Sequence, residues 1–158
     1  MGKGKDTRGS ILRTALKVFR ERRYDNSSIN EIAKRSGVST SLVYYYFANK
    51  EEIFKELAVT YRDGLEQEIR QHLSFEGDLL ENVFSILTTY KDFIKSHKDL
   101  YDIFREVEFV EKDLIRDYYY RITQLITQAL PKDFSRLYDV ESLSFAILGS
   151  IYFVVIKN

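Results

Sequence analysis

The sequence predicts an all-α protein in which a small N-terminal domain of three helices precedes a larger helical bundle. Apolar residues recur at three- and four-residue steps through most of the chain, which is the spacing of amphipathic helices. Helix breakers are rare, with one proline and seven glycines among 158 residues. Hydrophobic residues make up 44% of the chain, which is enough to form a core.

Charge divides the chain near residue 50. Residues 1–50 carry eleven Lys/Arg and four Asp/Glu, a net charge of +7, whereas residues 51–158 carry thirteen and twenty, a net charge of −7. We therefore expect one domain over residues 1–50 and a second over residues 51–158, joined by a helix that starts at about residue 50. The basic N-terminal domain is suited to a polyanionic partner.

The first three helices are predicted from apolar stripes and capping residues. The first covers about residues 7–22, and the second covers residues 29–36 after a cap at Ser27 or Ser28, with Glu31 at the spacing of a capping box. Gly37 follows the second helix, at a position where a left-handed backbone favours glycine.

The third helix is expected over about residues 41–47, after a cap at Ser39 or Thr40, with Val43 and Phe47 facing inward. Two short helices around a tight turn form a helix-turn-helix, a motif whose second helix enters the major groove of DNA.

The rest of the chain predicts five further helices. Asn49 can cap a fourth helix that ends near Leu73, and four more are expected at about residues 79–96, 98–110, 112–130 and 140–156. On the helix at 79–96, Leu80 and Phe84 are assigned to the buried face together with Val83, Leu87, Tyr90 and Ile94.

Residues 8–57 also carry a set of short motifs: Ile11-Leu-x-x-Ala15-x-x-x-Phe19, Tyr24-Asp25-x-x-Ser28-Ile29-x-x-Ile32-Ala33, Gly37-Val38-Ser39, Tyr44-Tyr-Tyr-Phe47 and Asn49-Lys50-Glu51. In combination they resemble the N-terminal DNA-binding domain of the TetR family of bacterial transcriptional regulators. The resemblance covers about a third of the chain. It implies that the C-terminal bundle binds an effector and forms a dimer.

The chain departs from the family pattern at three places. The family usually has glycine where this chain has Arg23, so either the arginine adopts a positive φ or the turn differs locally. The family often has glycine or alanine where Ser41 stands, at the start of the recognition helix. Members typically continue past the position of Asn158 with another helix that contributes to the dimer.

Helix starts and hydroxyl groups suit phosphate contacts, because free N–H groups and the helix dipole favour anions there. The resemblance implies that Tyr44 and Lys50 contact the DNA backbone, and Lys3, Lys5 and Arg8 are expected to extend the basic surface. The alternative is that Tyr44 only packs in the core and that the cations form a solvated face. The candidate DNA-binding residues are Ser28, Ser39, Thr40, Ser41, Leu42, Tyr44, Tyr45, Tyr46 and Lys50.

No Arg, Asn or Gln lies between Thr40 and Ala48. Bidentate base recognition from the third helix is therefore excluded. Specificity is expected from hydroxyl, apolar, shape or water-mediated contacts.

Aromatic residues are abundant, with twelve tyrosines and eleven phenylalanines, most of them beyond residue 80. The resemblance implies a cavity for a small-molecule effector, and the composition favours an apolar or aromatic ligand. The alternative is that these side chains only pack the core. The candidate lining residues are Tyr61, Phe84, Tyr90, Phe93, Phe104, Phe109, Tyr118, Tyr119 and Phe145.

Small residues on the last helix predict a homodimer interface, because they allow two helix backbones to approach closely. A packing seam within the chain is the alternative. The candidate interface residues are Ser142, Ala146, Gly149, Ser150 and Phe153.

The sequence gives no indication of an enzyme, a cofactor or a metal site. The chain has no cysteine, and its only histidines, His72 and His97, have no nucleophile or ligand partner at a recognisable spacing. The longest apolar run, residues 151–156, is much shorter than the roughly 20 residues that cross a bilayer. With no apolar signal segment at the start, we expect a soluble cytoplasmic protein.

These expectations combine into one hypothesis, a dimeric repressor that binds a palindromic operator in double-stranded DNA and is released by a small effector. The alternative is a helical DNA-binding adaptor without an effector, which a solid, fully packed bundle would favour.

Overall fold

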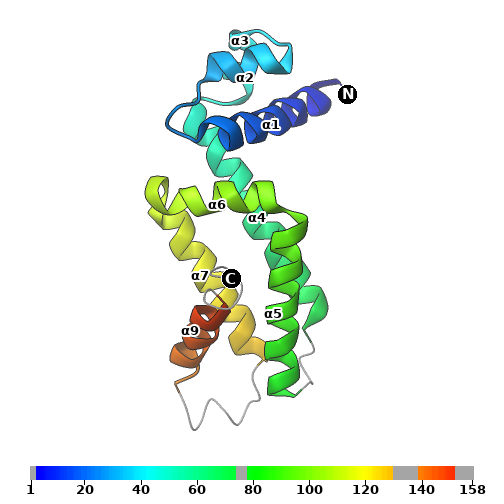
Figure 1. Cartoon of the computed structure of the whole chain (residues 1–158), viewed down its shortest axis with the longest axis vertical. Helices are drawn as coiled ribbons and strands as arrows, with labels where there is room; N and C mark the ends of the chain where they lie inside the picture. The colour runs from blue at the N-terminus through cyan, green and yellow to red at the C-terminus, as the bar shows by residue number, and fades with distance from the viewer. Residues whose placement is uncertain (1–2, 74–77, 130–138, 152–158) are drawn as a thin grey trace. The chain divides into compact units, whose positions relative to one another are not determined.

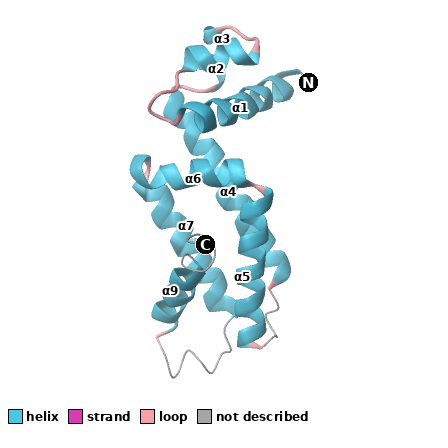
Figure 2. Ribbon diagram, in the orientation of Figure 1, coloured by secondary structure: helices cyan, strands magenta, loops and turns pink. Residues whose placement is uncertain are grey.

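The structure is a computed structural model that describes residues 3–73, 78–129 and 139–151, and every element in these ranges is a helix (Figure 2). This confirms the all-α prediction. None of the described helices is long and apolar enough to cross a membrane. The helices, labelled in Figure 1, are α1 (Lys3–Arg22), α2 (Ile29–Ser36), α3 (Thr40–Tyr46), α4 (Lys50–His72), α5 (Leu79–Ser96), α6 (Lys98–Val110), α7 (Lys112–Ala129) and α9 (Val140–Ile151).

The chain packs as two compact units. The first combines Met1–Tyr61 with Lys98–Lys112, and the second combines Arg62–His97 with Asp113–Asn158. Helix α4 therefore contributes to both units, and α6 packs with the N-terminal helices although it lies far from them in the sequence. These packing units do not coincide with the division expected at residue 50, which stays a prediction.

The core of the first unit is built from one face of each N-terminal helix. The rings of Phe19 on α1 and Phe54 on α4 meet edge to face, with centroids 5.4 Å apart. Fully or almost fully buried side chains around them are Ile11, Ala15, Val18, Ile32, Ala33, Val43, Phe47 and Ile53. The apolar stripes predicted for the first three helices are confirmed.

Capping residues define α2 and α3. The Ser28 hydroxyl accepts the Glu31 N–H at 3.2 Å. Gly37 adopts the expected left-handed conformation, with φ 69°, and the Val38 N–H donates to the Ala33 carbonyl at 3.1 Å, which closes a Schellman motif.

The recognition helix differs slightly from its prediction. Ser39 is its cap, with its hydroxyl accepting the Leu42 N–H at 3.1 Å, so α3 begins at Thr40 and ends at Tyr46, one residue earlier at each end than expected. Asn49 caps α4 as predicted, accepting the Glu52 N–H at 2.8 Å.

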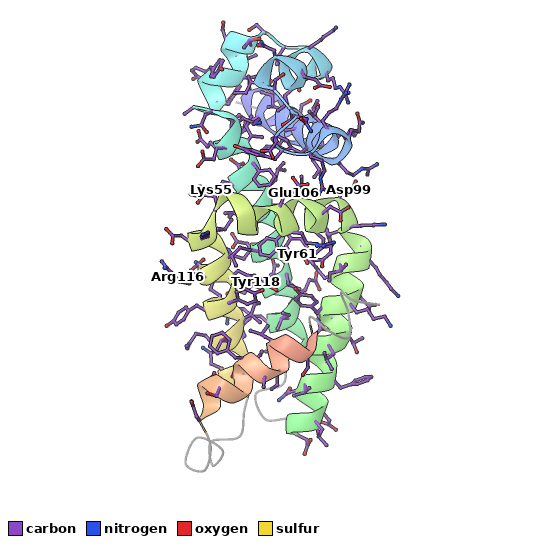
Figure 3. The ribbon with its side chains drawn as sticks, turned by 60° about the vertical axis from the view of Figure 1, so that its left-hand side comes forward. Lys55, Tyr61, Asp99, Glu106, Arg116 and Tyr118 are labelled. Atoms are coloured by element: carbon purple, nitrogen blue, oxygen red, sulfur yellow. The ribbon has the colours of Figure 1, made fainter. Side chains whose placement is uncertain are left out.

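Helix α6 is bonded to α1 and α4 within the first unit. Asp99 pairs with Arg20 at 2.5 Å, and Glu111, just after α6, pairs with Lys55 at 3.1 Å. Asp99 and Glu106 of α6 and Lys55 of α4 are labelled in Figure 3. The Lys55 ammonium holds the pKa of the Glu111 carboxyl below its usual range through this hydrogen bond.

In the second unit, α5 buries a different face from the one predicted. Leu80 and Phe84 were assigned to the core, but they are 76% and 71% exposed, so this assignment is wrong. The buried stripe runs through Asn82, Ile86, Tyr90 and Phe93, and of these only Tyr90 had been assigned to the buried face. Apolar residues cover about half of the circumference of this helix, and periodicity alone does not decide which part faces inward.

Arg23 lies between α1 and α2, at the position where the family that the sequence resembles usually has glycine, and it has a φ of 66°. Its N–H donates to the Phe19 carbonyl at 2.7 Å, and its side chain pairs with Glu106 at 2.9 Å. Of the two alternatives left open by the sequence, the structure therefore has the strained arginine.

We expect Arg23→Gly to unfold with a free energy about 1 kcal/mol higher than Arg23→Ala, measured by urea titration. Both substitutions remove the ion pair with Glu106, and only glycine relieves the positive φ. Equal stability of the two variants would show that the left-handed conformation carries no strain here.

Candidate nucleic-acid interface

The third helix turns its outer face to solvent. Val43 and Phe47, one turn apart, are buried and anchor the inner face. Tyr44 and Tyr45 lie between them in the sequence and are 54% and 78% exposed, and Ser41 is exposed as well. The segment after Gly37 is therefore presented outward, as expected, and Tyr44 is not a core residue.

The predicted phosphate-binding hydroxyls lie at the helix starts. Ser28 and Ser39 each accept a main-chain N–H through their side-chain oxygen. A hydroxyl that accepts in this way still has its own proton to donate, and free N–H groups surround it. Both positions can therefore donate to a phosphate oxygen while they cap their helices.

Lys50 makes contacts that the sequence did not indicate. Its ammonium donates to the main-chain carbonyls of Tyr24 at 2.6 Å and Ser27 at 3.1 Å, and it lies 4.1 Å from the centroid of the Tyr24 ring. Burial of that ring raises the pKa of Tyr24, with the nearby Glu51 carboxylate as the next cause, so the phenol stays neutral. In this structure Lys50 holds the turn between α1 and α2, and the phosphate contact assigned to it stays a prediction.

Other cations of this region are also paired. The Arg8 guanidinium bonds to the Glu56 carboxylate and lies 4.9 Å from the centroid of the Phe47 ring. Arg35 bonds to Glu21 at 2.5 Å, and this hydrogen bond raises the pKa of the Arg35 guanidinium. Arg8 thus forms an ion pair with Glu56 of α4. The side chains of Lys3 and Lys5 lie outside the described part.

One polar side chain at this surface was missed by the sequence analysis. Asn30 on α2 is exposed, and its side-chain oxygen accepts the Thr40 hydroxyl at 3.2 Å. No local sequence pattern links an asparagine of α2 to the first residue of α3.

The nine candidate effector residues are not gathered in one place. Tyr61 and Phe104 are buried in the first unit with ring centroids 5.0 Å apart, and in the second unit the buried hydroxyls of Tyr90 and Tyr118 bond at 2.8 Å (Tyr61 and Tyr118 are labelled in Figure 3). Phe93 is buried as well. The exposed candidates are Phe84, Tyr119 and Phe145, and the side chain of Phe109 lies outside the described residues.

A cavity of about 260 Å³ lies between α4 and α5 in the second unit. Of the candidate effector residues only Phe93 contributes to its described lining, which is otherwise polar: Glu68, His72, Thr88, Thr89, Asp92, Ser96 and His97. This lining differs from the apolar one that the composition favoured. Within the described ranges, no group of three or more His, Asp or Glu is placed to hold a metal ion.

The described candidates for the dimer interface share the exposed face of α9. The opposite face is buried through Ser144 and Leu148. Phe153 lies outside the described residues. The exposed candidates are Ser142, Ala146, Gly149 and Ser150.

Helix α3 has an exposed outer face, and Ser39 caps its first turn. Both features agree with the sequence model of bacterial regulatory proteins of the tetR family, which matches residues 11–57. Residues 11–57, about a third of the chain, are therefore similar to the N-terminal region of tetR-family proteins. Two solved structures named for this family share the fold of this chain: a regulatory protein from Rhodococcus RHA1 and PfmR from Thermus thermophilus. The Rhodococcus protein has a TM-score of 0.73 and 17% sequence identity, and the match covers 94% of this chain and 83% of that protein. PfmR has a TM-score of 0.69 and 19% sequence identity, and the match covers 92% of this chain and 84% of PfmR.

Proteins similar to this chain in sequence carry the names of transcriptional regulators, which agrees with the expectation that it is not an enzyme. The HTH-type transcriptional activator FasR of Mycolicibacterium smegmatis is 27% identical over 125 residues, which cover 79% of this chain and 57% of FasR. The regulator AcrR of Shigella flexneri is 32% identical over 83 residues, covering 52% and 39%. The chain thus spans roughly half the length of these relatives.

Replacing Lys50 by methionine should lower the free energy of unfolding by about 2 kcal/mol, measured by urea titration, because two charge-assisted bonds to carbonyls are lost. Lys34→Met is the matched control: it removes an exposed cation of α2 and should change stability by less than about 0.5 kcal/mol. If Lys50→Met is as stable as the control, the ammonium does not hold the turn.

Proposed function

We propose that this chain is a DNA-binding transcriptional regulator. The observation that carries the proposal is the solvent-exposed outer face of α3, with Ser41, Tyr44 and Tyr45 presented while Val43 and Phe47 anchor the helix. Such a helix can enter a major groove, where tyrosine and serine hydroxyls bond base edges or phosphates. The matched domain and the names of the relatives support the same function.

The regulator acts as a homodimer on a palindromic operator. Two α3 helices related by a two-fold axis fit successive major grooves when they lie roughly 34–36 Å apart. The exposed small residues of α9 and the exposed Leu80 and Phe84 of α5 supply surface that a second copy can bury. Repression is the simplest outcome of such binding, although one relative, FasR, is named an activator.

A small apolar or aromatic effector controls this binding. It binds the second unit, where the cavity of about 260 Å³ includes the Phe93 ring in its lining. An effector that prefers a dimer form with the wrong spacing of recognition helices releases the operator, and the ratio of its two affinities sets the response. The Bacillus subtilis relative named fatty acid metabolism regulator protein, 35% identical over 84 residues, agrees with an apolar ligand.

Selection from duplexes with about 20 random base pairs tests the function, since this length holds two half-sites one helical turn apart. We expect the full chain to enrich an inverted repeat and to bind it as a dimer in analytical ultracentrifugation. Tyr45→Ala should weaken binding of the enriched duplex about tenfold, as the loss of one good contact does.

Tyr120→Ala is the matched control, because it removes an exposed tyrosine from α7 in the second unit. It should leave the affinity for the duplex unchanged. If no sequence is enriched, or if the two tyrosine variants bind alike, α3 is not the recognition helix.

A further inference from the structure

A hydrogen bond joins the two helices of the helix-turn-helix on their exposed side. The Thr40 hydroxyl, at the first position of α3, donates to the side-chain oxygen of Asn30 on α2 at 3.2 Å. Asn30 is exposed and Thr40 is half-buried. Neither side chain is needed for a cap, since Ser28 and Ser39 cap these helices.

In the structure this bond has the oxygen of the Asn30 carboxamide toward the Thr40 hydroxyl. A free carboxamide can rotate by half a turn and exchange its oxygen acceptor with its NH₂ donor at little cost. With the oxygen bonded to Thr40, the NH₂ group is the end of the carboxamide that is left to donate to another partner. Asn30 is therefore presented as a hydrogen-bond donor.

The Asn30 amide lies beside Thr40, one of the residues of α3 that are assigned to DNA contact. Thr40 and Tyr44 are one turn apart on α3 and share a face, so Asn30, Thr40 and Tyr44 follow one another across the two helices. On α2, the exposed Lys34 lies one turn after Asn30 and adds a cation beside it.

We propose that Asn30, oriented by Thr40, is a specificity-determining residue that recognises guanine in the operator. The proposal rests on the function proposed above. Guanine presents two neighbouring acceptors in the major groove, O6 and N7, which suit an NH₂ donor. Adenine places an amino group next to N7 and opposes such a donor, and thymine offers one acceptor beside a methyl group.

The Asn30 side chain supplies an amide, a group that α3 itself lacks. No Arg, Asn or Gln lies between Thr40 and Ala48, so the recognition helix itself has no amide or guanidinium for base edges. An amide from α2, bonded to the first residue of α3, provides one NH₂ donor among tyrosine and serine hydroxyls, which can rotate to donate or accept.

Selection from the same random duplex library, with each variant of the full chain, tests the proposal. The wild-type chain should enrich guanine at one position of each half-site. Asn30→Ala should lower that guanine preference about tenfold and leave the preferences at other positions intact. Circular dichroism melting confirms that each variant is folded before selection.

Two variants of Thr40 test the orientation. Thr40→Val keeps the shape and removes the hydroxyl, so the amide can rotate and adenine should become acceptable at the same position. Thr40→Ser keeps a hydroxyl and should preserve the guanine preference.

The outcomes separate the two proposals. If the wild-type chain enriches a motif but Asn30→Ala changes no position, or weakens all sequences equally, Asn30 does not recognise a base and the regulator function stands. If Thr40→Val keeps the guanine preference, the orientation by Thr40 is wrong. If the wild-type chain enriches nothing, the proposed function itself fails.

Discussion

The first unit depends on how the turn between α1 and α2 is held. The Tyr24 ring lies against Phe54 and Phe19, with centroids 4.6 Å and 5.9 Å away, and the Lys50 ammonium covers it while binding the carbonyls of Tyr24 and Ser27. Main-chain carbonyls in a tight turn need partners when water is excluded, and one ammonium with three donors can satisfy two of them. The position of α2, and of α3 after it, follows from this turn.

The same turn joins α6 to the N-terminal helices. Glu106 accepts the main-chain N–H of Tyr24 at 3.2 Å and pairs with Arg23 at 2.9 Å, so a single carboxylate of α6 bonds to two consecutive residues of the turn. The Arg20–Asp99 pair adds a second bond at the other end of α6. Any displacement of α6 therefore has to break or carry along the bonds that position α2. The first unit thus includes a helix that the sequence places far from the helix-turn-helix.

Local signals predicted the fold well because helix limits are set by neighbouring residues. The bounds of α2, α5 and α6 were predicted as found, and the caps at Ser28, Ser39 and Asn49 were among the candidates. The missed features depend on contacts between distant residues. The partners of Lys50, the bond from Thr40 to Asn30 and the exposed face of α5 are decided by tertiary packing, which leaves no period or spacing in the sequence.

The compact first unit carries less net positive charge than residues 1–50 alone. Residues 1–50 have a net charge of +7, but the compact first unit also contains the rest of α4 up to Tyr61 and all of α6, and it carries fifteen Lys/Arg and twelve Asp/Glu, a net charge of +3. Carboxylates from outside residues 1–50, on Glu56, Asp99 and Glu106, pair with arginines of α1 and of the turn that follows it. Paired cations release fewer counterions on binding DNA, so the non-specific part of the affinity is smaller than the charge count implies. Discrimination between sequences by the proposed regulator then depends more on the hydroxyl and amide groups that α2 and α3 present.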